Sequence, residues 1–120
     1  MSGVYIHIPF CKQACNYCNF HFSTSLQQKD ELINALINEI SLTPFFEGEK
    51  EIIDTIYFGG GTPSIINIDD LRLIFDALHK KFPISAVAEI TLEANPDDIT
   101  SQKLQLWKEI GINRFSIGIQ

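Results

Sequence analysis

The stretch IIDTIYFGGGTPS, residues 52–64, passes from an apolar, β-branched run directly into three glycines and a Thr-Pro-Ser turn. Such a run is typical of a buried strand, and the turn after it is typical of a corner between a strand and a helix. Comparable runs occur at residues 4–8, 88–92 and 114–119. We therefore predict four strands, of which residues 52–58 form the second.

The segments between these runs have the periodicity of amphipathic helices. Apolar residues recur on one face of each segment: Leu32, Ile33, Leu36, Ile37 and Ile40 in the first, Leu71, Ile74, Phe75, Leu78 and Phe82 in the second, and Leu104, Trp107 and Ile110 in the third. Asn67 and Thr100 are suitable N-caps for the second and third helices, and Gly111 is a suitable C-terminal stop.

Strands that alternate with helices form a parallel sheet with right-handed crossovers. The predicted order is β-α-β-α-β-α-β, in one α/β domain that spans residues 1–120 and is either an open sheet or part of a (β/α) barrel. The last predicted strand reaches Gln120 with no helix after it, so its outer edge would lack a partner, which is a liability that proteins usually cover. We therefore expect the chain to be the N-terminal portion of a longer, barrel-like protein.

Composition excludes several classes of protein. The chain has no apolar run of about 18 residues and no secretory signal, so we expect no membrane span and a cytoplasmic protein. The formal net charge is −6, and the 9 basic residues are scattered along the chain. Nucleic acid is therefore not an expected partner, because phosphate binding needs clustered cations.

All 3 cysteines, Cys11, Cys15 and Cys18, lie in the loop that would follow the first strand. An odd number of crowded cysteines in a cytoplasmic chain favours a metal site over a disulfide framework. Together with His21 they could hold zinc in a Cys3His site. Alternatively, the three thiolates could hold an iron–sulfur cube whose fourth iron binds a small molecule through an amine and a carboxylate. Bulky aromatic neighbours favour the cluster because they limit solvent access, but the spacing alone leaves both interpretations open.

Polar groups follow the other predicted strands as well. Ligands of parallel α/β proteins bind at the carboxyl ends of the strands, and GGGTPS, EANP and SIGIQ occupy those ends here. Residues 59–61 offer backbone amides that a ligand can approach, and Thr62 adds a hydroxyl. Glu93 and Gln120 suit ribose hydroxyls. Singly, these residues have structural alternatives, a strained turn for the glycines and a salt bridge for Glu93, but together they predict one ligand site.

The first strand contributes to the same site. Alternation places Tyr5 and His7 on one face, and Val4, Ile6 and Ile8 on the other. The apolar face would pack against the helices, so Tyr5 and His7 would face the interior and its ligand. We expect His7 to support the metal loop indirectly, or to be a hydrogen-bonded core histidine, rather than to bind metal.

Taken together, these motifs resemble the radical S-adenosylmethionine family. CKQACNYC is similar to the family signature C-x3-C-x-aromatic-C, with Tyr17 as the aromatic residue. YIHIPFC, GGGTPS, EANP and SIGIQ, in this order, resemble the branch that contains oxygen-independent coproporphyrinogen III oxidases and the related HemW heme chaperones. The resemblance covers nearly the whole chain and implies the N-terminal part of a partial, TIM-like (β/α) barrel.

The resemblance implies a [4Fe–4S] cluster on the cysteine loop, with S-adenosylmethionine chelating its open iron. In the family, the reduced cluster passes one electron to the sulfonium, which is cleaved to methionine and a 5′-deoxyadenosyl radical. The protein positions this cofactor and excludes water and oxygen. The family positions that contact it correspond here to Tyr5, Tyr17, Gly60, Gly61, Thr62, Glu93 and Gln120.

One departure divides the branch. The oxidases resemble C-x3-C-x2-C-x-C, whereas Phe20 stands here in place of the fourth cysteine. The resemblance therefore favours a HemW-type chaperone, which would bind heme and deliver it to hemoproteins, over an oxidase that decarboxylates porphyrinogen propionates. In the family, the heme-contacting segment and two further cofactor contacts lie beyond residue 120. We therefore expect the chain alone to be inactive, with a half-open cofactor site.

Overall fold

All four predicted strands are present in the computed structural model, which describes residues 2–8, 22–42, 52–60 and 63–117. The strands are β1 (Ser2–Ile8), β2 (Ile53–Gly60), β3 (Ile84–Ala94) and β4 (Arg114–Ile117). The helices are α2 (Phe22–Leu42), α3 (Ile68–Lys81) and α4 (Ser101–Ile110), with the 3-10 turns η4 (Pro63–Ile65) and η5 (Pro96–Asp98) after β2 and β3.

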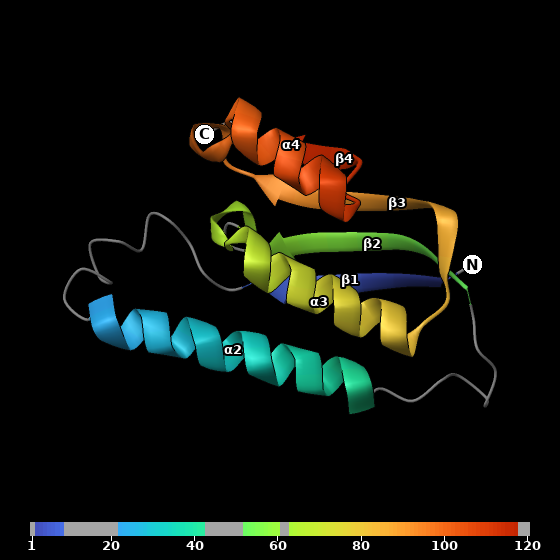
Figure 1. The fold of residues 1–120 in the computed structure, drawn as a ribbon, viewed down its shortest axis with the longest axis horizontal. Helices are drawn as coiled ribbons and strands as arrows, with labels where there is room; N and C mark the ends of the chain where they lie inside the picture. The colour runs from blue at the N-terminus through green and yellow to red at the C-terminus, as the bar shows by residue number, and fades with distance from the viewer. Residues whose placement is uncertain (1, 9–21, 43–51, 61–62, 118–120) are drawn as a thin grey trace.

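The strands form one parallel sheet in the order β1-β2-β3-β4. Each strand therefore lies next to the strand that precedes it in the chain. Right-handed crossovers in such a sequential sheet place every helix on the same face, and α2, α3 and α4 lie together on one side of the strands (Figure 1). A doubly wound sheet would reverse its strand order, so the predicted α/β fold takes its barrel form.

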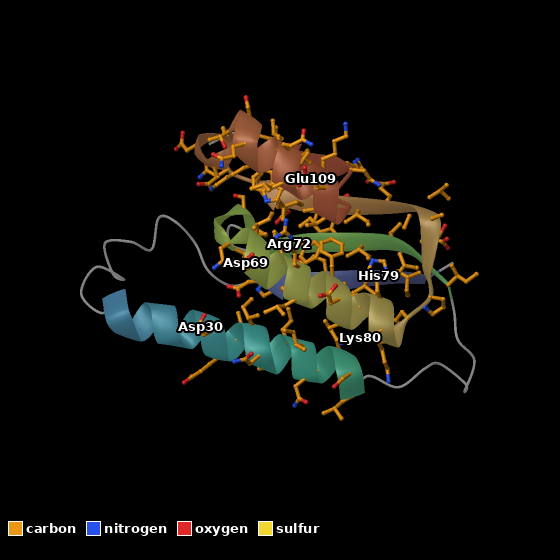
Figure 2. All side chains as sticks on the ribbon, in the orientation of Figure 1. Asp30, Asp69, Arg72, His79, Lys80 and Glu109 are labelled. Atoms are coloured by element: carbon orange, nitrogen blue, oxygen red, sulfur yellow. The ribbon has the colours of Figure 1, made fainter. Side chains whose placement is uncertain are left out.

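The hydrophobic core fills the space between the sheet and its helices. From the sheet, Ile8, Ile56, Phe58 and Leu92 are almost wholly buried. The helices supply the rest of the core, chiefly Ile33 and Ile40 from α2, Leu71, Ile74, Phe75 and Leu78 from α3, and Trp107 from α4. The apolar faces predicted for α2 and α3 are therefore confirmed, and charged side chains of the same helices, such as Asp30 and Lys80, are exposed (Figure 2).

The predicted helix ends are confirmed by their hydrogen bonds. The Asn67 side chain accepts from the backbone N–H of Asp70 at 2.9 Å, and that of Thr100 accepts from Lys103 at 3.1 Å. Gly111 ends α4 with a φ of 119°, in the left-handed region that favours glycine.

The expectation that Leu104 faces the core is wrong. Leu104 is 37% exposed, whereas the indole of Trp107, 2% exposed, packs against the Phe115 ring of β4, with ring centroids 5.5 Å apart. Among the described helices, none is long and apolar enough to cross a membrane.

Candidate functional site

The face of the sheet that points away from the helices is polar near the carboxyl ends of the strands. Tyr5 of β1 lies opposite Tyr57 of β2, and His7 lies opposite Gly59. Glu93 of β3 lies opposite Ser116 of β4. The predicted alternation in β1 is confirmed, since Ile6 and Ile8 are buried under the helices while Tyr5 and His7 are exposed on this face. We call the residues at this end of the sheet the rim: Tyr5, His7, Tyr57, Gly59, Gly60, Glu93 and Ser116.

Glu93 is the centre of the rim. Its Oε2 accepts from the Tyr57 hydroxyl at 2.7 Å, and its Oε1 accepts from the backbone N–H of Gly60 at 3.0 Å. These partners replace the salt bridge that was the alternative expectation for this carboxylate. Each carboxylate oxygen can accept more than one hydrogen bond, so both keep capacity for a ligand donor.

Two stacked tyrosines lie beside this carboxylate. The rings of Tyr5 and Tyr57 are stacked, with centroids 5.8 Å apart and planes 15° apart. Tyr5 is 60% exposed, and its hydroxyl lies 3.4 Å from Nδ1 of His7. Among the described residues His7 is exposed on this face, and both expectations for it, indirect support of the metal loop or a place in the core, stay predictions.

The glycines of the rim bring the ends of β1 and β2 close together. A Cβ on Gly59 would lie 2.8 Å from the Tyr5 hydroxyl and 2.8 Å from Cε1 of Tyr57. Gly60 has a φ of 115°, and a Cβ there would lie 2.5 Å from the Ile8 carbonyl oxygen. Gly60 thus fits the strained-turn alternative and also directs its amide at Glu93.

Tyr57 is held in its protonated, donating form. Its hydrogen bond to Glu93 is the main cause that raises the pKa of Tyr57 above its ordinary value, and burial and the charge of Glu93 act in the same direction. A hydrogen bond with Ser116 opposes them. The hydroxyl is therefore a donor at neutral pH.

A buried hydroxyl ties two rim loops together beneath the surface. Ser64, 1% exposed, donates to Oδ2 of Asp98 at 2.9 Å and accepts from the backbone N–H of Asn95 at 3.2 Å. Ser64 belongs to the GGGTPS motif, and Asn95 to the EANP motif. Ser64 of the first motif is therefore joined directly to Asn95 of the second, a contact that sequence reasoning did not detect.

The structure brings together the predicted site residues that it describes, namely Tyr5, Gly60 and Glu93. Tyr57 was missed, although the alternation applied to β1 would have placed it on the same face of β2. Among the described residues no three His, Cys, Asp or Glu side chains are grouped to hold a metal ion. The remaining predicted ligands and the zinc alternative lie outside the described residues and stay predictions: Cys11, Cys15, Tyr17, Cys18, His21, Gly61, Thr62 and Gln120.

A sequential parallel sheet with its described helices on one face and a polar rim at the carboxyl ends of the strands is the arrangement of part of a (β/α) barrel. The profile of the Radical SAM superfamily matches residues 5–120, and the chain belongs to this superfamily. This confirms the family resemblance found in the motifs.

Similar proteins include heme chaperones and an oxidase. The heme chaperone HemW of Bacillus subtilis is 40% identical to this chain, in a match that covers 100% of this chain and 32% of the chaperone. The heme chaperone HemW of Escherichia coli is 35% identical, in a match that covers 98% of this chain and 32% of the chaperone. An oxygen-independent coproporphyrinogen III oxidase of Bradyrhizobium diazoefficiens is 33% identical, in a match that covers 99% of this chain and 27% of the oxidase. The chain therefore spans about a third of the length of these curated relatives.

A solved structure supports the fold. The coproporphyrinogen III oxidase of Escherichia coli, described as a radical SAM enzyme, superposes with a TM-score of 0.73 at 29% identity, covering 98% of this chain and 27% of that one. The α/β order predicted from the sequence is thus confirmed as part of a radical SAM barrel.

Proposed function

We propose that this chain forms part of the cofactor-binding core of a radical SAM protein of heme or porphyrin metabolism. In this proposal Cys11, Cys15 and Cys18 hold a [4Fe–4S] cluster, and the rim binds S-adenosylmethionine. The observation that carries the proposal is the Glu93 carboxylate, which two donors hold at the carboxyl end of β3 with acceptor capacity left on both oxygens.

The described rim fits the chemistry of S-adenosylmethionine. The cofactor carries a sulfonium, an ammonium and two ribose hydroxyls, which are cationic or hydrogen-bond donors, and Glu93 is an anionic acceptor. Gly60, which needs no room for a side chain against the Ile8 backbone, presents its amide at Glu93, and the exposed Tyr5 ring offers an apolar surface. Tyr17, Gly61, Thr62 and Gln120 would add contacts from the neighbouring loops. When bound and reduced, this cofactor supplies a 5′-deoxyadenosyl radical.

Metal content separates the cluster from the zinc alternative. Membership in the radical SAM superfamily supports the cluster, because full-length members use a [4Fe–4S] cluster and S-adenosylmethionine. We expect the full-length protein, reconstituted anaerobically with iron and sulfide, to become brown, and Cys11→Ala, Cys15→Ala or Cys18→Ala to abolish the colour. His21→Ala should leave it unchanged. A colourless protein with one zinc ion that His21→Ala removes would refute the proposal.

Cofactor binding tests the rim directly. Glu93→Gln preserves the size of the side chain but removes its charge, so we expect about a 10-fold or greater loss of S-adenosylmethionine affinity with unchanged iron content. Equilibrium dialysis of the anaerobic, reconstituted full-length protein measures this. An unchanged affinity in Glu93→Gln would place the cofactor elsewhere.

Within the family, we propose a HemW-type heme chaperone. Two observations support this proposal: the 40% identity to the Bacillus subtilis chaperone, and Phe20 at the position where the oxidase pattern has a further cysteine. The full-length protein should then bind heme, pass it to a hemoprotein client in the cytoplasm and yield no product from coproporphyrinogen.

The second candidate is an oxygen-independent coproporphyrinogen III oxidase, which the likeness to the Escherichia coli oxidase favours. An anaerobic assay with coproporphyrinogen and a reductant separates the two, because only an oxidase would form vinyl groups from the propionates. In either case we expect residues 1–120 alone to be inactive, and cofactor cleavage by them at full-length rates would contradict this.

A further inference from the structure

We propose that Tyr57 is a positioning residue for the cofactor, because its hydroxyl fixes the orientation in which the Glu93 carboxylate receives ligand donors. This inference rests on the proposed binding of S-adenosylmethionine at the rim. It assigns a role to a residue that is absent from the motif residues discussed above.

The two side chains meet through the strand register. Tyr57 is paired with Thr91, and Glu93 lies two residues further along β3 on the same face. A glutamate has three rotatable side-chain bonds, and its carboxylate turns easily about the last one. Here the Tyr57 hydroxyl at 2.7 Å holds one oxygen and the Gly60 amide at 3.0 Å holds the other. Two donors on two different oxygens fix both the position and the plane of the carboxylate.

Tyr57 can hold Glu93 because its own ring is confined. The ring is stacked on Tyr5 on one side, and near Gly59 it occupies the space that a Cβ at that position would need, with Cε1 at 2.8 Å. Gly59 therefore leaves room for the Tyr57 ring, and the ring carries the hydroxyl to Glu93. The position of Glu93 therefore depends on Tyr57, and the position of Tyr57 depends on Gly59.

A double-mutant cycle on the full-length, reconstituted protein tests this role, with S-adenosylmethionine as the ligand. Tyr57→Phe keeps the stacked ring and removes only the hydroxyl, so we expect roughly a 3- to 10-fold loss of affinity, which corresponds to the net loss of one hydrogen bond. In the Glu93→Gln background the same change should cost less than about 2-fold, since residues that act through one another are not additive. The control Thr55→Val removes a hydroxyl from the same face of β2, two residues away, and should leave the affinity unchanged.

The outcomes are distinguishable. If the wild-type protein does not bind S-adenosylmethionine, the proposed function fails. If the wild-type protein binds and Glu93→Gln weakens binding, but Tyr57→Phe does not, the inference about Tyr57 is wrong and the proposed function stands. Equal losses from Tyr57→Phe in both backgrounds would also overturn the inference, because the hydroxyl would then act independently of Glu93. So would a loss of iron or of the cooperative thermal transition in Tyr57→Phe, which would make the hydroxyl a structural group of the sheet.

Discussion

Adjacent glycines at the end of β2 are needed for different reasons. Gly59 has an ordinary backbone conformation, and a side chain there would collide with Tyr5 and Tyr57. Gly60 has a φ of 115°, and a side chain there would collide with the backbone of Ile8. The first glycine therefore makes room for the aromatic rings of the rim, while the second permits the turn and the close approach of β1.

Gly60→Ala should be strongly destabilising. The substitution adds a Cβ 2.5 Å from the Ile8 carbonyl oxygen in a left-handed conformation, so we expect the free energy of unfolding to fall by about 3 kcal/mol or more. Gly111→Ala is the matched control, with a φ of 119° but a nearest contact of 3.7 Å, and should cost only about 1 kcal/mol. Chemical denaturation measures both, and equal losses would contradict the packing argument at Gly60.

The Tyr57–Glu93 hydrogen bond predicts a pH dependence. Because the folded protein raises the pKa of Tyr57, its contribution to stability is fully present below the ordinary tyrosine pKa of about 10 and is lost as the pH rises through the folded value. The difference in unfolding free energy between the wild type and Tyr57→Phe should therefore be constant up to about pH 9.5 and shrink above pH 10. Denaturation across this range measures it, and a difference that grows above pH 10 would contradict the assignment.

Asn113, between α4 and β4, forms hydrogen bonds with the backbone of β3 through its side-chain amide. Its Oδ1 accepts from the backbone N–H of Ile90 at 2.9 Å, and its Nδ2 donates to the Ala88 carbonyl at 2.9 Å. The backbone N–H of Asn113 donates to the Ile90 carbonyl at 3.0 Å. These bonds satisfy β3 at the point where β4 has not yet begun to pair with it. Asn113 thereby sets where β4 starts, one residue later.

Asn113→Ala should weaken the junction of α4 with β4. It leaves the Ile90 N–H and the Ala88 carbonyl without this side-chain partner, at a cost of about 1–3 kcal/mol in the free energy of unfolding. The control Asn38→Ala removes an exposed amide from α2 and should change stability by less than about 0.5 kcal/mol. If the two variants lose the same amount in urea unfolding, the amide clamp has no special role.

The elements themselves were predictable from local patterns. Alternation in β1, the apolar faces of α2 and α3, and the caps at Asn67 and Thr100 all depend on neighbours within a few residues. The start of β3 was not predictable in this way. It begins at Ile84, four residues earlier than expected, because Ile84 pairs with Ile53 across a register shift that local sequence does not encode.

The centre of the site was only partly predictable for the same reason. Glu93 was singled out because an acid at the end of an apolar strand needs a partner, but the sequence could not say which partner. Tyr57 lies 36 residues from it, and Ser64 lies 34 residues from Asp98. Such contacts are set by strand register and by the packing of loops, so they appear only in the folded chain.

In the fold as a whole, the sheet separates two environments. Its apolar face packs against helices, and its other face carries polar groups along its length, including the ion pair of Arg114 with Glu89 and the buried hydroxyl of Thr91. In a (β/α) barrel this second face is the interior, and ligands enter from the carboxyl ends of the strands. The rim lies at that end, and β1 leads directly into the cysteine loop.

The proposed function therefore requires one ligand that bridges the rim and the cysteine loop. The most direct measurement is the electron paramagnetic resonance spectrum of the reduced, full-length protein, recorded with and without S-adenosylmethionine. We predict a cluster signal that S-adenosylmethionine perturbs, that Cys11→Ala, Cys15→Ala or Cys18→Ala abolishes, and that in Glu93→Gln needs more cofactor to be perturbed. A protein that takes up no iron, or a cluster signal that S-adenosylmethionine leaves unchanged, would contradict the account.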